Sequence, residues 1–559
     1  MISGIKMDQK IRFFLGLFIL FFLVVPRLTY AQTSQISGLA PDNEQIATFP
    51  INDPTFIESP DGQHVIYLAQ PFRGFFNRLY SASTSGERTA IELTSEETGG
   101  AINYKISPDS QNVVFRSSNG FYSVPITGGT PVKLNTFDAR QQVFDISPDS
   151  QRVVILNFGE IWSIPISGGE NTLITVNQPE NGFDIDGFKI SPDSKFVVYR
   201  FSQMVESGRP IIHLFRASIL GGEPVLDLLA QADDIESVLD FSFSPNSEYI
   251  VYNIFTLTDL NLAVNRVSIE GGPTNRLSGV PNGDGGGRLL SILNDSERVY
   301  YSFGDTFATF NRIFSVPIDG SVSAATEIVN IGGNRFGFTR VLNEGQRILL
   351  SSEDSSSGLQ SVALIDLSNN SNPLVTLGSV VAENGFSSIA INDAESAAAL
   401  LSSIFDSSSG MFQTTITSLD LINGLFITTL ERDTSAQSLL PLFNSEILID
   451  SSGETIVFAE QTSVGNPGIV SALPLSGGQV ETLSAPEING PTVFNYAISN
   501  DGLRVFFIAG RTSGVTDEAA LFVVDIPEQL VDIPEQLEES GDLCFPLLIN
   551  NGGAAIICL

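Results

Sequence analysis

The chain has 559 residues, of which 42% are hydrophobic and 16% are charged, so it can bury a large core, and disorder over most of its length is excluded. Its 63 acidic residues outnumber the 28 basic ones and give a formal charge of −35, which repels nucleic acid phosphates and anionic lipid. Nucleic acid is therefore excluded as a partner, and the acidity favours either solubility or attraction of cations or a basic protein.

Residues 1–31 are typical of a signal peptide. Basic residues within 6–12 precede an apolar run, residues 13–25, that ends at Pro26. This run is shorter than the roughly 20 residues of a membrane-spanning helix, and the small residues that follow suit cleavage after Ala31. We therefore expect an exported protein, periplasmic or extracellular, with no membrane span after cleavage. An uncleaved N-terminal anchor is the alternative.

One ten-residue phrase recurs along the chain. It reads ISPDSQNVVF at 106–115, ISPDSQRVVI at 146–155 and ISPDSKFVVY at 190–199. Looser copies give ten units, with anchor residues at Ser59, Ser107, Ser147, Ser191, Ser244, Leu293, Leu342, Ile391, Asp450 and Ser499. Their spacing, 40 to 59 residues, is typical of a solenoid, an array or a propeller.

Each unit reads as four short antiparallel strands. In residues 104–135, the SPDS tetrapeptide predicts a tight turn, apolar runs on either side predict strands, and Gly128 with Gly129 predicts a second hairpin turn. One such meander cannot bury both of its faces, so neighbouring units must stack. Because no helical pattern interrupts residues 32–530, this range predicts an all-β propeller of about ten blades. A single ring is favoured because no linker divides the series; two smaller rings are the alternative.

The SPDG or SPDS turn, followed by two strands and a Gly-Gly hairpin, resembles the WD-like repeat of TolB-type propellers. Similar repeats form the non-catalytic propeller of prolyl oligopeptidase-type proteins. The resemblance covers residues from about 45 to 530 and implies a structural role for the turn. The residues to which it assigns that role are Pro60, Asp61, Pro108, Asp109, Pro148, Asp149, Pro192 and Asp193.

Length variation between units is concentrated in the hairpin that joins the second and third strands. Residues 202–210 and 253–261 are examples. In an up-and-down blade, this hairpin shares a face with the connections between blades, whereas the Asp and Gly turns share the opposite face. Because insertions and function collect on loops, we expect the variable face to bind a partner. Neutral loop drift on a scaffold is the alternative.

The sequence offers no catalytic constellation and implies no catalytic or cofactor-binding residue. Its two histidines, His64 just before a strand and His213 in a loop-to-strand segment, form neither an HExxH motif nor a nearby pair, and a GxSxG elbow is absent. The single tryptophan, Trp162, suits a packed blade position better than a carbohydrate platform. Carboxylates brought together from different blades would still permit a hydrolase or lyase acting on polysaccharide or peptide.

Two acidic segments are candidate calcium sites. One contains Asp184 and Asp186, and the other contains Asp284. Calcium takes six to eight oxygen ligands, and neither segment has the spacing of a complete binding loop. Ordinary Asx turns are the alternative reading of both segments.

The C-terminal region is separate in character. An acidic linker is expected at 531–542, and residues 543–559 read as two apolar strands around an Asn-Asn-Gly-Gly turn. Cys544 and Cys558 are equidistant from that turn, so in an exported protein they suggest a disulfide. Two unpaired thiols are the alternative. The whole chain is expected to be a non-catalytic protein-interaction scaffold in the bacterial envelope or outside the cell.

Overall fold

The computed structural model describes Ser34–Gln35, Gln45–Ile46, most of residues 56–526 and two terminal strands. Within 56–526, the ranges outside the description are 71–76, 86–89, 136–142, 176–182, 205–209, 231–236, 257–260, 280–285, 305–309, 333, 343–345, 355–359, 367–373, 381–385, 393, 407–410, 423–424, 435–446, 462–467, 477–479, 484–491 and 512–517. The chain divides into two compact units, Met1–Asp525 and Ile526–Leu559.

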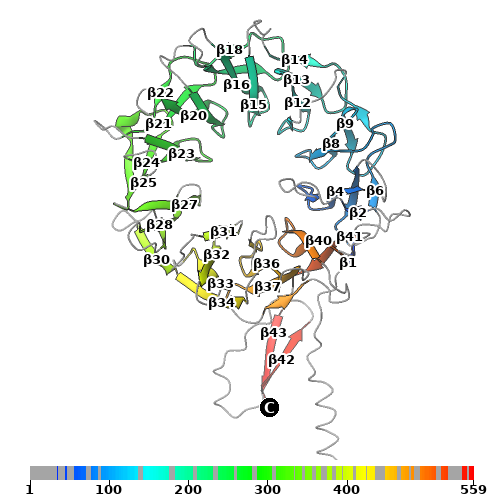
Figure 1. Cartoon of the computed structure of the whole chain (residues 1–559), viewed down its shortest axis with the longest axis vertical. Helices are drawn as coiled ribbons and strands as arrows, with labels where there is room; N and C mark the ends of the chain where they lie inside the picture. Colours follow the sequence, from blue (N-terminus) through cyan, green and yellow to red (C-terminus); the bar gives the residue numbers. More distant parts are fainter. Residues whose placement is uncertain are drawn as a thin grey trace, which may run out of the picture. The chain divides into compact units, whose positions relative to one another are not determined.

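The repeats of the first unit form a ring of ten antiparallel blades (Figure 1). Blade 1 contains β2 (Gln45–Ile46), β3 (Phe56–Glu58), β4 (His64–Gln70), β5 (Arg78–Ser83) and β6 (Ala90–Glu92). Blade 2 contains β7 (Asn103–Ile106), β8 (Asn112–Ser117), β9 (Gly120–Pro125) and β10 (Val132–Lys133). Blade 3 contains β11 (Phe144–Ile146), β12 (Arg152–Asn157), β13 (Glu160–Pro165) and β14 (Thr172–Leu173).

The next four blades repeat this order. Blade 4 contains β15 (Phe183–Ile190), β16 (Phe196–Met204), β17 (Pro210–Ser218) and β18 (Leu226–Asp227). Blade 5 contains β19 (Ser237–Phe243), β20 (Tyr249–Thr256), β21 (Asn261–Ser268) and β22 (Asn275–Arg276). Blade 6 contains β23 (Gly286–Ile292), β24 (Arg298–Gly304), β25 (Phe310–Pro317) and β26 (Thr326–Asn330). Blade 7 contains β27 (Arg335–Leu342), β28 (Arg347–Glu353), β29 (Gln360–Asp366) and β30 (Leu374–Val380).

The last three blades bring the chain back to its start. Blade 8 contains β31 (Phe386–Ile391), β32 (Ala397–Asp406), β33 (Met411–Asp420) and β34 (Leu425–Thr434). Blade 9 contains β35 (Leu448–Ile449), β36 (Thr455–Gln461), β37 (Gly468–Pro474) and β38 (Glu481–Thr482). Blade 10 contains β39 (Thr492–Ile498), β40 (Arg504–Arg511) and β41 (Glu518–Asp525), and its outer strand is β1 (Ser34–Gln35).

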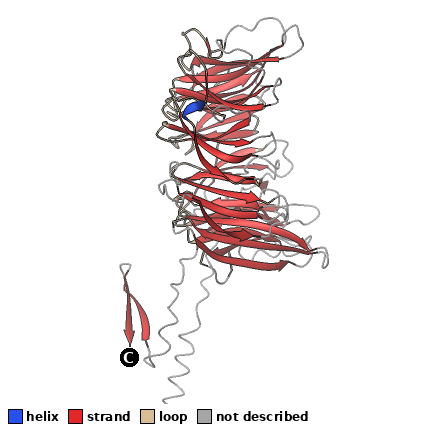
Figure 2. Cartoon of the chain, turned by 90° about the vertical axis from the view of Figure 1, so that its left-hand side faces the viewer, coloured by secondary structure: helices blue, strands red, loops and turns tan. Residues whose placement is uncertain are grey.

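The predicted all-β architecture and the single ring of ten units are confirmed. Apart from one 3-10 turn, η1 (Val322–Ala324), every described element is a strand (Figure 2). No helix in the described residues is long and apolar enough to cross a membrane. The sequence did not anticipate the way the ring closes, in which β1 from the N-terminal segment pairs with β41 from the far end of the repeats.

The hydrophobic core is divided into clusters that join neighbouring blades. Phe115, for example, packs in one cluster with Ile66 and Leu79 of the preceding blade. Within a blade, the second and third strands present aromatic rings to each other, as in the stacking of Phe115 on Tyr122 at a centroid distance of 5.5 Å. Equivalent stacked pairs are Tyr67–Tyr80, Tyr199–Phe215, Tyr301–Phe314 and Phe507–Phe522. Blades 1, 2, 4, 6 and 10 therefore use the same cross-strand position for a stacked aromatic pair.

The second unit contains the predicted hairpin, formed by β42 (Cys544–Ile549) and β43 (Gly553–Cys558). The register places Cys544 opposite Cys558. Residues paired across an antiparallel hairpin have Cα atoms roughly 4.5–5.5 Å apart, which lies within the range that a disulfide spans. The disulfide itself stays a prediction, and thiol alkylation before and after reduction decides it.

Candidate binding face

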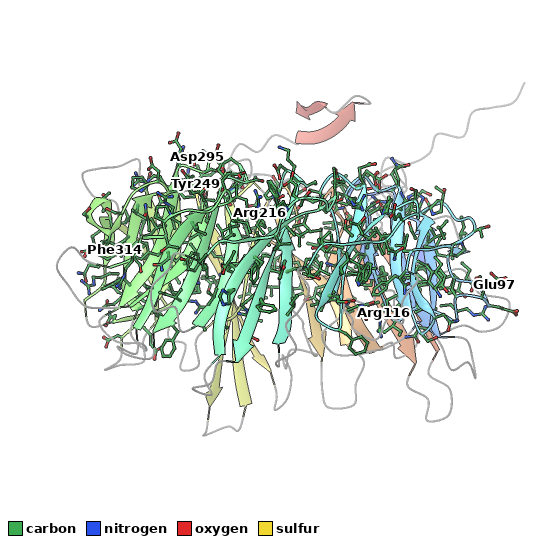
Figure 3. All side chains as sticks on the ribbon, turned by 90° about the horizontal axis from the view of Figure 1, so that it is seen from above. Glu97, Arg116, Arg216, Tyr249, Asp295 and Phe314 are labelled. Atoms are coloured by element: carbon green, nitrogen blue, oxygen red, sulfur yellow. The ribbon has the colours of Figure 1, made fainter. Side chains whose placement is uncertain are left out.

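The meander gives the propeller two chemically different faces. We call the face with the turns between first and second strands, and between third and outer strands, the turn face. The opposite face carries the second-to-third hairpins and the connections between blades, and we call it the loop face. Figure 3 shows Asp295, from a first-to-second turn, on one face and Arg116, near the end of β8, toward the other.

On the turn face, the first-to-second turns share one set of hydrogen bonds. Ser107 Oγ donates to Asp109 Oδ1 over 2.5 Å, and the same carboxylate oxygen accepts the Gln111 N–H at 3.0 Å. The aspartates Asp61, Asp149 and Asp193 make the same two contacts with Ser59 and Gln63, Ser147 and Gln151, and Ser191 and Lys195. Pro60, Pro108, Pro148 and Pro192 occupy the second position of these turns. These carboxylates are thus engaged within their own turns.

In blades 2 to 6 the fourth residue of the turn is a serine that links its blade to the preceding one. Ser110 adopts a left-handed φ of 60°, and its Oγ accepts the Asp61 N–H of the preceding blade at 3.0 Å. The same bond, 2.9–3.1 Å long, joins Asp109 to Ser150, Asp149 to Ser194, Asp193 to Ser247 and Asn246 to Ser296. A left-handed serine costs about 1–2 kcal/mol, which the hydrogen bond offsets in part. Serine at this position therefore serves the contact between blades, which glycine could not make.

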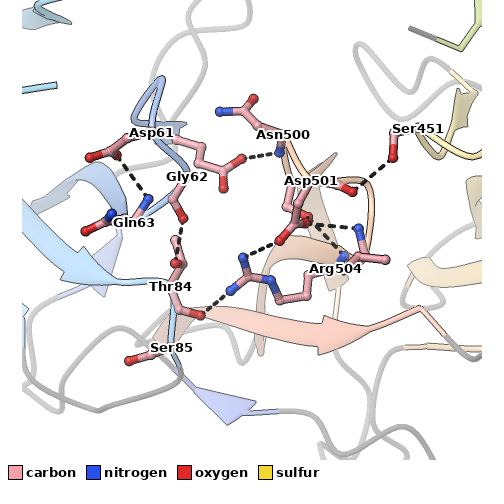
Figure 4. Close-up of polar contacts among 12 residues, drawn as sticks. Asp61, Gly62, Gln63, Thr84, Ser85, Ser451, Asn500, Asp501 and Arg504 are labelled. Atoms are coloured by element: carbon pink, nitrogen blue, oxygen red, sulfur yellow. Dashed lines mark hydrogen bonds and ion pairs between the residues drawn. The ribbon is translucent and has the colours of Figure 1, made fainter. Parts of the chain in front are cut away.

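Hydrogen bonds of a different pattern close the ring (Figure 4). Ser451 Oγ donates to the Asp501 carbonyl (2.9 Å), and Arg504 Nη1 donates to the Thr84 carbonyl (2.7 Å). The Asn500 N–H donates to Glu58 Oε2 (2.6 Å), and Asn500 Nδ2 donates to the Ser59 carbonyl (2.9 Å). Burial raises the pKa of Glu58, although the Asn500 N–H and Arg504 act against it. Blades 9, 10 and 1 are therefore joined without the serine bond that links blades 1 to 6.

The turn aspartates should make stability depend on acid. Burial raises the pKa of Asp61, but hydrogen bonds from Ser59 and the Gln63 N–H outweigh it and hold the pKa below its usual range. The pKa values of Asp193 and Asp501 are lowered in the same way, with help from Lys195 and Arg504 respectively. A carboxyl group whose pKa is lower in the folded than in the unfolded protein stabilises the fold at pH values above the unfolded pKa. This stabilisation is lost as the pH falls toward the folded pKa, so stability should fall below about pH 4.

We therefore predict that replacing Asp61, Asp193 and Asp501 together by asparagine flattens the acid side of a plot of Tm against pH. Blade 5 already carries asparagine at this place, where Asn246 Oδ1 accepts from Ser244 Oγ at 2.7 Å and from the Glu248 N–H at 3.1 Å. The triple variant should consequently fold. A curve as steep as that of the wild type would show that other carboxylates control acid unfolding.

The loop face absorbs the differences between blades. The second and third strands pair over six residues in blades 2 and 3, over nine in blade 4 and over ten in blade 8. In blades 2, 3 and 4 the second strand begins five residues after its anchor serine, and in blade 8 it begins six residues after Ile391, so the additional length extends toward the loop face. Residues 205–209 and 257–260, within the two predicted binding loops, lie outside the described residues.

Phe158 is an unusual residue on the described part of the loop face. It occupies the tip of the β12–β13 hairpin with 59% of its surface exposed, and its φ of 50° is left-handed. With Gly159 at φ 76°, the tip has positive φ at both central positions, a turn that favours Asn-Gly. Phenylalanine here is both strained and exposed to water, and the fold gives no reason for it. Ile102 and Val143, at the loop-face ends of two first strands, are also exposed.

The first strands lie nearest the ring centre (Figure 1), and they carry paired charges between neighbouring blades. Lys105 Nζ lies 2.8 Å from Asp145 Oδ1, and Lys189 Nζ lies 3.2 Å from Asp240 Oδ1. The two lysines also lie over the rings of Phe144 and Phe241. These two carboxylates thus face a cation rather than each other.

The remaining candidate residues are not gathered into one site. His213 lies inside strand β17, not in a loop-to-strand segment as predicted, because the longer blade 4 hairpin extends this strand back to Pro210; its Nδ1 is 2.8 Å from Asp227 Oδ2. Trp162 is half-buried in β13, where its indole N–H donates to Glu160. No group of three potential metal ligands occurs among the described side chains.

The calcium candidates are only partly placed by the structure. Asp184 and Asp186 belong to strand β15 rather than to a turn, with a register irregularity between Ile185 and Gly187. The side chains of the two aspartates, and the whole of Asp284, lie outside the described residues. A role for any of the three in calcium binding stays a prediction.

Comparisons with known proteins assign this chain to no family. No protein-family model matches the sequence. It also matches no curated protein. A solved structure titled "Crystal structure of the eukaryotic initiation factor" is similar over 73% of this chain and 93% of its own, with 11% identity and a TM-score of 0.44. A likeness at that level carries no argument about this chain, and the resemblance to TolB-type propellers stays a prediction.

Proposed function

We propose that this protein is an exported, non-catalytic scaffold of the bacterial envelope or cell exterior, and that its loop face binds a protein partner. The observation that carries the proposal is the asymmetry between the two faces. The turn face repeats one hydrogen-bonded turn from blade to blade, whereas the loop face bears hairpins of unequal length. A constant face is what blade packing requires, and a variable face is where specificity accumulates.

Phe158 supports the same assignment. A left-handed, exposed phenylalanine weakens the fold, because about 1–2 kcal/mol of strain is not repaid by burial. Such a side chain is useful when a partner covers it, since aromatic residues dominate the energy of protein interfaces. Export is supported by the basic and then apolar N-terminal residues, which are typical of a signal peptide.

The proposal predicts that Phe158→Asn gains stability and loses the partner. Asparagine suits a left-handed turn position, so unfolding should require about 1 kcal/mol more free energy, measured by urea titration. Residues 32–559 serve as bait on envelope extract of the source organism, and any retained protein is then purified and bound to each variant. Leu503→Ser, which changes a 66% exposed apolar residue on the turn face, is the matched control.

A second bait shortens residues 202–210 and 257–260. The proposal expects the purified partner to bind the wild type and Leu503→Ser, and to bind Phe158→Asn or the shortened bait at least about tenfold more weakly. Equal binding to all baits would move the interface away from the loop face. A wild-type bait that retains no partner would contradict the scaffold proposal and direct attention to turnover of glycans or peptides.

A further inference from the structure

The outer edges of the blades differ greatly in length. The outer strand has two or three residues in blades 1 to 5 and in blades 9 and 10, namely β6, β10, β14, β18, β22, β38 and β1. In blade 8 the outer strand, β34, has ten residues and pairs with β33 from Leu425 to Thr434, with one register irregularity between Phe426 and Thr428 and regular pairing from Thr428 onward. No described strand pairs with the other edge of β34.

A long outer strand has direct chemical consequences. In an antiparallel pair, alternate residues direct both their N–H and their C=O away from the paired strand, so the free edge of β34 presents a row of main-chain donors and acceptors. Proteins usually blunt such edges with short strands or proline. Most blades here end in a very short outer strand, whereas β34 is long and contains no proline.

We propose that the free edge of β34 accepts an extended segment of another polypeptide as a fifth strand of blade 8. Main-chain hydrogen bonds would supply the affinity, as in other strand-addition complexes. The segment should be basic, because residues 386–434 carry six acidic side chains and Arg432 as their only basic one. A second copy of this chain is disfavoured as the occupant, since both copies carry a formal charge of −35.

This surface is distinct from the loop face, so its failure and that of the proposed function are distinguishable. The loop-face variants should leave strand addition intact, and the edge variants described next should leave binding through Phe158 intact. A basic partner with an extended tail would contact both surfaces, and the two sets of variants would still measure the contribution of each surface separately.

The test uses residues 32–559 and a fluorescein-labelled peptide of about eight residues that alternates threonine and valine, with lysine at every fourth position. Two variants, Thr428→Pro and Thr429→Pro, change neighbouring residues of β34. Because N–H directions alternate, one of them removes an outward N–H and the other removes a bond to β33. The variant that keeps the wild-type Tm is the one whose proline replaces an outward N–H, because no bond to β33 is lost in it.

We expect the anisotropy of the labelled peptide to rise when the wild type is added. The outward proline variant should bind the peptide at least about tenfold more weakly. A peptide with N-methyl groups on alternate residues should not bind the wild type, which tests main-chain recognition even if both proline variants unfold.

Equal binding of the N-methylated peptide would overturn strand addition. Equal binding of a version with glutamate in place of lysine would overturn the basic partner. A wild-type dimer in sedimentation that the outward variant loses would replace the partner with a second copy.

Discussion

Gly502→Ala should destabilise the propeller by about 1–2 kcal/mol through backbone strain and by about a further 1–3 kcal/mol through overpacking. Gly502 has φ 71°, and an added Cβ would lie 2.0 Å from Ser451 Oγ and 2.5 Å from the Ser451 backbone nitrogen. The turn of blade 9 would have to retreat, and the Ser451 bond to the Asp501 carbonyl would be lost with it.

The matched control is Gly222→Ala. Gly222 has φ 78°, close to that of Gly502, but no atom lies within 4 Å of an added Cβ. This variant should therefore show the strain alone. Urea unfolding of the two variants separates the contributions, and equal losses of stability would mean that the contact between blades 9 and 10 adds nothing to ring closure.

Phe115→Ala should cost about 3–5 kcal/mol, the range for removing a buried aromatic side chain. Phe115 is fully buried, stacks on Tyr122 and packs in the cluster that joins blades 1 and 2. The loss should lower the urea midpoint and Tm together. Because neighbouring blades share this cluster, the first two blades should lose protection from hydrogen exchange before the others.

Phe158→Ala is the control for the loss of an aromatic ring as such. Its side chain is 59% exposed, so stability should change by no more than about 0.5 kcal/mol. If Phe115→Ala were equally mild, the stacked pairs would not be the cores of the blades, and the repeat would owe its stability to the turns instead.

The ring of ten blades could be predicted because the turn chemistry is local. The position of one anchor was wrong by one residue: the equivalent of Ser107 in blade 8 is Asn392, not Ile391. Asn392 Oδ1 accepts the Ala397 N–H at 2.9 Å, as Ser107 Oγ accepts the Asn112 N–H at 2.9 Å. A search for serine and apolar spacing does not detect an amide that performs the same task.

Contacts between blades could not be predicted from a single unit. The sequence showed serine or glycine as the fourth residue of the turn, but only the structure relates Ser150 to the Asp109 N–H and Gly502 to Ser451. The length of β34 was hidden in the same way, because apolar and threonine-rich runs do not show which strand ends the sheet. Phe158 was missed because a strained turn is invisible until its dihedral angles are known.

Closure by β1 has a consequence for the order of assembly. Each blade pairs strands that are close in sequence and can form as soon as its own segment is available, whereas the bond between Asn500 and Glu58 spans 442 residues. A chain emerging N-terminus first must hold its first strand unpaired until the last blade arrives. We therefore expect refolding to show rapid formation of strands followed by a slower step limited by the joining of the two ends.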